Sequence, residues 1–150
     1  MTHRLDEAPR RAARPALGVL AWLRLARVFQ KIQQASAEHL RLFTLNVAQF
    51  DVLARIGATE GLTQQELANS LLVTKSNVCQ LLDRLERAGL VERRPDGRAK
   101  RLFLTPAGHE LFERVVPAQE RLIAEQLAVL SRTEQAQLVR LLRTLDRALG

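Results

Sequence analysis

The chain has 150 residues, of which 47% are hydrophobic and 26% are charged, a composition typical of one core-forming globular domain. Lysine and arginine number 23 against 16 acidic residues, so the formal net charge is +7, which favours a polyanionic partner such as nucleic acid or an anionic membrane surface. A single cysteine, Cys79, and the absence of zinc-finger spacing exclude a disulfide-stabilised secreted domain and a structural zinc site. We therefore expect a cytoplasmic protein without a cofactor.

The amino-terminal part is predicted to contain a basic tail and a long helix. Residues 1–15 carry four arginines and two prolines with few apolar side chains, which predicts a flexible tail. From Ala16 to about Phe43, apolar residues recur at helical spacing and predict one long amphipathic helix. Arg24 and Arg27 interrupt its most apolar stretch, which is too short to span a membrane and is not typical of a signal peptide. We expect no membrane partner and no targeting segment.

Two further helices are predicted from their capping residues. Asn46 and Gln49 resemble a capping pair at the start of a second helix, which is expected to end at the turn 57–61. Thr63 and Glu66 have the spacing of a capping box, in which each side chain satisfies a free backbone donor of the other. This box predicts a short third helix.

The fourth predicted helix completes a helix-turn-helix. It covers 75–88, with Thr74 as its N-cap and Gly89 at its end. Its apolar stripe comprises Val78, Leu81, Leu82 and Leu85. Because only a short turn separates it from the third helix, the two helices form a helix-turn-helix motif.

A hairpin is predicted directly after the helix pair. The runs 90–94 and 101–104 have strand character. The turn 95–98 between them contains an Asp-Gly pair, which favours a hairpin.

Two helices are predicted to complete the chain. Thr105 and Pro106 have the form of an N-cap and a first helical residue, and the helix extends to about Leu130. Ser131 and Glu134 form the capping box of the last helix. The apolar stripe of that helix comprises Leu138, Leu141, Leu142, Leu145 and Leu149. The predicted fold is therefore mainly α-helical with a small β-hairpin.

Residues 49–108 closely resemble the winged helix-turn-helix domain of the multiple antibiotic resistance regulator (MarR) family. Residues 62–68 read L-T-Q-Q-E-L-A, which is similar to the family's L-T-x-x-E-L-A. The run L-D-R-L-E-R-A-G-L-V-E-R at 82–93 is similar to the family's D-R-L-E-x-x-G-L-V-E-R segment. Asp96-x-Arg98, followed by L-T-x-x-G at 104–108, is similar to its wing signature.

The resemblance implies a homodimeric transcription regulator with three parts. The DNA-binding winged helix-turn-helix covers 46–105. The dimerisation helices cover 16–45 and 106–150, and the basic tail covers 1–15. Members of the family commonly release DNA when a small aromatic molecule occupies the cleft between the dimerisation helices and the winged domain. The sequence permits such a cleft without defining its residues. Trp22 is a candidate for lining it, although a lone tryptophan at helical spacing is more often a core or interface residue.

The outward face of the fourth helix is predicted to read DNA bases. If the apolar stripe faces inward, the opposite stripe includes Ser76, Gln80 and Asp83. Base readout in the major groove needs short donors and acceptors near the helix start. The residues that supply them are Lys75, Ser76, Asn77 and Gln80. Arg84 is expected to contact a phosphate, and Asp83 to hold a neighbouring basic group by a salt bridge.

The hairpin is predicted to grip the DNA backbone. It carries five cations, namely Arg93, Arg94, Arg98, Lys100 and Arg101. Asp96 is the single acidic residue among them, and DNA phosphates are expected to relieve the repulsion between the cations. Arg98 is the predicted minor-groove contact, because a guanidinium suits a narrow electronegative groove, and Asp96 is expected to orient it.

The sequence therefore predicts a sequence-specific, effector-responsive repressor that binds double-stranded DNA at a palindromic operator as a homodimer. Two alternatives stay open. One is a non-specific architectural DNA-binding protein, and the other is a helical module for protein interaction. No catalytic constellation or zinc-protease motif is present in the sequence, so an enzyme is not expected.

Overall fold

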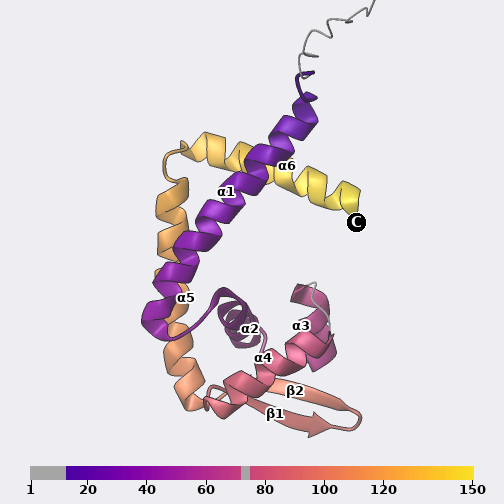
Figure 1. Cartoon of the computed structure of the whole chain (residues 1–150). Coiled ribbons are helices and arrows are strands. Elements are labelled where there is room, and N and C mark those ends of the chain that lie inside the picture. The colour runs from indigo at the N-terminus through magenta and orange to yellow at the C-terminus, as the bar shows by residue number, and fades with distance from the viewer. Residues whose placement is uncertain (1–12, 72–74) are drawn as a thin grey trace, which may run out of the picture. The chain divides into compact units, whose positions relative to one another are not determined.

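A computed structural model describes residues 13–71 and 75–150 (Figure 1). The predicted N-cap Thr74 and most of the predicted basic tail lie outside the described residues. The chain divides into two compact units, residues 1–31 and 32–150. The winged helix-turn-helix lies within the second unit.

The predicted first helix is confirmed, and it ends in a tighter turn. Helix α1 covers Leu17–Leu40, and a short 3₁₀ helix, η1, continues over Arg41–Phe43. Thr44 ends η1 in the left-handed conformation, with φ of 58°. Within the second unit, the end of α1 is linked to α5, because His39 Nδ1 lies 3.0 Å from Gln119 Oε1.

Helix α2 covers Val47–Ala58 and begins with the predicted capping box. The Gln49 amide donates to Asn46 Oδ1 over 2.8 Å, and the Asn46 amide donates to Gln49 Oε1 over 3.0 Å. Three residues of α2 are buried, namely Val52, Leu53 and Ile56. The helix is therefore capped locally and buried on one face.

The helix-turn-helix consists of α3 (Gln64–Leu71) and α4 (Lys75–Arg87). The Glu66 amide donates to Thr63 Oγ1 over 3.1 Å, which confirms one half of the predicted capping box. Val78, Leu82 and Leu85 are buried, as the apolar stripe predicts. After α4, Gly89 adopts a φ of +75°, the left-handed conformation that favours glycine at a helix end.

The predicted hairpin forms, with longer strands than expected. Strand β1 (Val91–Asp96) pairs antiparallel with β2 (Ala99–Leu104), from Val91 opposite Leu104 to Asp96 opposite Ala99. Only Gly97 and Arg98 form the turn, and Gly97 has a φ of +61°. Pro95 does not end the pairing, because it lies on an edge strand where its missing N–H is tolerated. Figure 1 shows the hairpin extending beside α4.

The turn between α2 and α3 adds a short third segment to the hairpin, which the sequence did not predict. The Gly61 amide donates to the Leu102 carbonyl over 2.8 Å, and the Leu102 amide donates to the Leu62 carbonyl over 2.9 Å. Thr63 forms an isolated antiparallel bridge with Arg101. These bonds attach β2 to the start of α3, so the wing and the helix pair share one backbone network.

Helices α5 (Pro106–Leu127) and α6 (Arg132–Leu149) complete the chain. Both predicted caps are confirmed: the Gly108 amide donates to Thr105 Oγ1 over 3.0 Å, and Ser131 forms its capping box with Glu134. Gly108 lies against the Leu90 carbonyl so closely that a Cβ atom would overlap it. A glycine is therefore needed where α5 begins.

The core lies in the winged helix-turn-helix and the adjoining part of α5. Its buried residues are Leu40, Leu45, Val52, Leu53, Ile56, Leu62, Leu67, Ala68, Val78, Leu82, Leu85, Val91, Leu102, Leu104 and Val115. This single cluster holds α2, α3, α4 and the hairpin together. No helix in the described ranges is long and apolar enough to cross a bilayer.

Candidate nucleic-acid interface

The outward face of α4 carries exposed polar side chains. Asn77, Gln80 and Arg84 are exposed, whereas Val78 and Leu82 on the opposite side are fully buried. Lys75 and Ser76 form the first turn of α4, and their side chains lie outside the described part of the structure. The helix therefore presents amide and guanidinium groups to solvent at positions suited to contact with base edges and phosphates.

Arg93 faces α4, in contrast to the expectation that it contacts DNA. Its Nη2 donates to Asp83 Oδ1 over 2.6 Å, and its Nε donates to Glu86 Oε2 over 2.8 Å. Its side chain is only 17% exposed. The bonds and the charge of Arg93 hold the pKa of Glu86 below its ordinary value. The expected salt bridge of Asp83 with a neighbouring basic group is confirmed.

Strand alternation explains the direction of Arg93. Successive side chains of a strand point to opposite faces, so Arg93 shares a face with buried Val91 and with its register partner Leu102. Arg94 and its register partner Arg101 lie on the other face. Only that second face is free to point away from α4.

Arg94 lies on the outer face of the hairpin and is partly neutralised there. Its Nη2 donates to Glu92 Oε2 over 3.2 Å, and its guanidinium carbon lies 4.1 Å from the centre of the Phe103 ring. More than half of its side chain is exposed. Arg94 therefore lies over the ring of Phe103, where a cation–π interaction adds to its ion pair, and its side chain stays largely accessible to solvent.

Asp96 pairs with Arg101, whereas the sequence led us to expect that it orients Arg98. Arg101 Nε donates to Asp96 Oδ2 over 2.6 Å, and Arg101 Nη1 donates to the Gly61 carbonyl over 2.8 Å. The reason is register: Asp96 lies opposite Ala99, so the next residue of β2 on the same face is Arg101. Arg98 lies in the turn, outside this ladder. The expected role of Asp96 as a partner of Arg98 is wrong.

The carboxylates of the chain itself relieve most of the repulsion that DNA phosphates were expected to relieve. Three of the five hairpin cations are paired, and their partners are Asp83, Glu86, Glu92 and Asp96. Arg98 and Lys100 form no ion pair with any residue that the structure describes. The uncompensated charge therefore concentrates at the tip of the wing.

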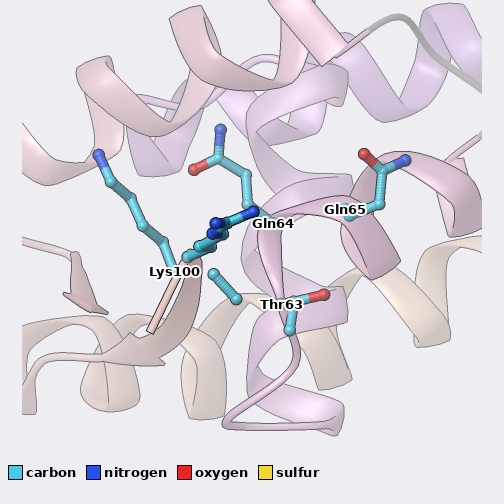
Figure 2. Close-up of a pocket in the computed structure, with 6 residues that line it drawn as sticks. Thr63, Gln64, Gln65 and Lys100 are labelled. Carbon is cyan, nitrogen blue, oxygen red and sulfur yellow. The ribbon is translucent and has the colours of Figure 1, made fainter. Parts of the chain in front are cut away.

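Arg98 and Lys100 line a groove between the wing and the start of α3 (Figure 2). Its volume is about 470 Å³, and its lining also includes Thr63, Gln64, Gln65 and Ala99. The sequence did not predict that Thr63, Gln64 and Gln65 would line a groove with the wing. They precede the recognition helix in the chain, and only the bonding of β2 to the α2–α3 turn brings them beside the wing.

Gln64 also connects the two helices of the motif. Its Nε2 donates to Cys79 Sγ over 2.7 Å. Cys79 on α4 is half-buried and contacts α3 through this bond. Within residues 13–71 and 75–150, no group of histidine, cysteine and acidic side chains is suited to hold a metal ion.

The comparisons with known proteins agree with this geometry. A sequence model of the MarR family matches residues 43–102. An uncharacterized HTH-type transcriptional regulator of Bacillus cereus is 42% identical over 103 residues, which are 69% of this chain and 70% of the relative. The match therefore extends beyond the winged domain.

Solved structures share the fold over most of the chain. The S. aureus MepR–DNA complex has a TM-score of 0.79 and 26% identity, and the match covers 91% of this chain and all of that one. The organohalide-sensing regulator RdhR in its 2,4-dichlorophenol-bound form has a TM-score of 0.82 and 20% identity, with 98% and 89% covered. The family match, the Bacillus cereus relative and the likeness to MepR together show that the chain belongs to the MarR family of winged helix-turn-helix proteins, which are DNA-binding transcription regulators and not enzymes.

Proposed function

We propose that the chain is a sequence-specific repressor that binds a palindromic operator as a homodimer and releases it when a small aromatic effector binds. The observation that carries the proposal is the charge of the wing: Arg98 and Lys100 have no carboxylate partner among the described residues, although the paired cations beside them do. A polyanion that contacts the wing tip supplies the missing countercharge.

In this proposal α4 lies in the major groove and supplies sequence specificity. The exposed amides of Asn77 and Gln80 can each pair with the two hydrogen-bonding positions of adenine in the major groove. Lys75 and Ser76 belong to the same helix start and complete the proposed set of base contacts. Arg84 contacts the DNA backbone and positions the helix without specifying sequence.

The wing supplies contacts that depend little on sequence. Arg98 enters the minor groove, where its place in a two-residue turn lets it protrude without a bulky element. Lys100 lies beside it in the groove next to α3 and contacts the adjacent phosphate. Arg94 and Arg101, which stay exposed on the outer face, add to the attraction of the backbone.

An exposed apolar surface on α6 supports the proposed homodimer. Over its described length α6 buries no residue, and its leucines are exposed at Leu141, Leu142, Leu145 and Leu149. Exposed apolar stripes of this kind mark contacts with another chain. A second copy of the same helix is the simplest occupant, because a twofold axis also places two α4 helices in successive major grooves roughly 34–36 Å apart.

The proposed effector is a small aromatic molecule. The support is the dichlorophenol-bound relative RdhR, whose fold this chain shares. Trp22 is our candidate effector contact, and its side chain is exposed in the first unit.

One set of experiments tests the proposed function. Genomic fragments bound by the protein are selected, footprinted and compared with competitor DNA. We expect one palindromic site with an affinity at least about 10³ times that for competitor DNA. An equal affinity for both would favour an architectural protein, and no shift of any DNA at low salt would favour a protein-interaction module. Release of the operator by phenolic compounds tests the effector.

The oligomeric state is tested separately by Leu145→Arg, with Arg143→Ala on the polar side of α6 as the control. Sedimentation should show a dimer for the unmodified chain and for the control, and a monomer for Leu145→Arg. Because Leu145 is 54% exposed, the substitution leaves the core of the subunit intact. A dimer that persists in the Leu145→Arg variant would exclude α6 from the interface.

A further inference from the structure

Two carboxylates on α4 are unexpected in a helix that contacts DNA. Asp83 and Glu86 both lie on α4 and are 49% and 43% exposed. A DNA backbone repels such groups, and an asparagine and a glutamine at these positions would avoid the repulsion. Their presence needs a function that outweighs this cost.

Both carboxylates bind one guanidinium, that of Arg93 on β1. The bonds are 2.6 Å to Asp83 and 2.8 Å to Glu86, and they use the Nη2 and Nε atoms of the planar fork. A second contact of Nη2 with Glu86 Oε1 measures 3.4 Å. An arginine held through two of its nitrogens has a fixed orientation as well as a compensated charge.

The bonds of Arg93 lie between the base and the tip of the wing, where they can limit movement of the tip. The connection between α4 and β1 contains Gly89, whose left-handed backbone belongs to a conformationally permissive residue. Backbone bonds hold the base of the wing at Leu90, including one from its amide to the Leu85 carbonyl over 3.0 Å. Arg93 lies further out, and Asp96, the last residue of β1 before the turn that carries Arg98, lies roughly 10 Å beyond it at the usual rise of a strand. A small rotation at the base therefore moves the tip by a larger distance.

We propose that Arg93, Asp83 and Glu86 form a clamp that sets the position of the wing relative to α4, and that the clamp determines operator specificity. Arg93 is a positioning residue here and not a DNA contact. The clamp holds the wing tip at the place where Arg98 and the amides of α4 bind one operator together. This inference rests on the proposed function, because it assumes that wing and helix contact the same site.

The clamp and simple electrostatics predict opposite changes in operator affinity when the two carboxylates are removed. The double variant Asp83→Asn, Glu86→Gln removes two negative charges from the DNA-facing module, so electrostatics alone predicts tighter binding to all DNA. The clamp predicts tighter binding to competitor DNA and weaker binding to the operator. We expect the ratio of operator to competitor affinity to fall about tenfold.

Matched variants separate the clamp from other roles. Glu92→Gln removes one negative charge from the same hairpin but outside the clamp, and it should keep the affinity ratio. Arg93→Lys keeps the charge and loses the two-nitrogen fork, so its ratio should lie between those of the unmodified chain and the double variant. Thermal unfolding of each variant confirms that it is folded. If the double variant does not fold, Glu86→Gln alone is used. Asp83 then still holds Arg93, so the affinity ratio should fall by less than in the double variant, but should still lie below the ratio of Glu92→Gln.

Each outcome decides between the possibilities. A double variant that binds the operator more tightly than the unmodified chain overturns the clamp and leaves the proposed function standing. The same holds if Glu92→Gln lowers the affinity ratio as much as the double variant does. If the unmodified chain shows no preferred site, the proposed function fails, and the specificity role of the clamp fails with it. A lowered ratio in the double variant, with Glu92→Gln unchanged, supports the clamp.

Discussion

Asp96 at the end of β1 and Arg101 on β2 form an ion pair of 2.6 Å, and this pair leaves Arg98 in the turn without a carboxylate partner among the described residues. The same aspartate therefore neutralises one arginine and does not reduce the charge of the other. Arg101 also donates to the Gly61 carbonyl, so the pair connects the wing to the α2–α3 turn. The unpaired charge of Arg98 therefore lies at the tip of a wing whose strand β2 is bonded to the α2–α3 turn.

Arg98→Ala tests the contact of the wing tip with DNA. We expect weaker binding to operator and competitor alike, because an arginine in the minor groove depends little on sequence in the major groove. The slope of log affinity against log salt should decrease by about one. Fluorescence anisotropy titrations at several salt concentrations measure both quantities. An unchanged salt slope would exclude Arg98 from the interface.

Gln80→Ala tests base readout by α4. Gln80 is exposed on α4, so the variant should fold normally. Loss of a two-bond contact with a base should cost about 1–3 kcal/mol of operator binding and relax the preference at one base pair. Selection of bound sequences from a random library measures the preference. A variant that selects the same site with the same stringency would remove Gln80 from the readout set.

Gly108→Ala tests the close approach of α5 to the end of α4. An added Cβ overlaps the Leu90 carbonyl, and a backbone group has little freedom to move away. We expect a loss of about 1–3 kcal/mol in the free energy of unfolding. Gly18→Ala is the matched control, because nothing lies within 4 Å of its Cβ position and alanine favours a helix. Urea unfolding of both variants checks the contrast, and equal stabilities would contradict it.

The pH dependence of stability tests the ion pair of Glu86 with Arg93. Arg93 holds the pKa of Glu86 below its ordinary 4.5 in the folded chain, so folding favours the ionised form. The stabilisation is complete above the pKa that Glu86 has in the unfolded chain. It is lost as the pH falls through the lower pKa that Glu86 has in the folded chain. Since Glu86 is 43% exposed, we expect it to amount to less than about 1 kcal/mol.

The measurement compares thermal unfolding of the unmodified chain and Glu86→Gln across pH. The unmodified chain should be slightly more stable at pH 7, and the difference should disappear in acid below the ordinary pKa of a glutamate. A difference that stays constant down to acid pH would assign the effect of the substitution to something other than the charge of Glu86.

The amino-acid sequence by itself determined the secondary structure and the family. The capping residues Asn46, Thr63 and Ser131 act on amides three positions away, so the start of each helix is readable in the sequence. Periodicity likewise predicted that Val78 and Leu82 are buried. The Asp96–Gly97 pair predicted the hairpin, although the two-residue turn consists of Gly97 and Arg98. The family followed from short motifs that occur in the expected order along the sequence.

Only the tertiary structure decided which cations of the wing are free. Arg93 is bound by α4, and Asp96 pairs with Arg101 although Arg98 is nearer in the sequence. The reason is that strand register and packing determine which side chains share a face. The approach of Thr63 and Gln64 to Lys100 likewise depends on backbone bonds between segments about 40 residues apart, Gly61 and Leu102 among them. Charge composition counts all five cations of the wing equally, because it contains no distances. An ion pair forms only where folding brings a cation within a few ångströms of a carboxylate.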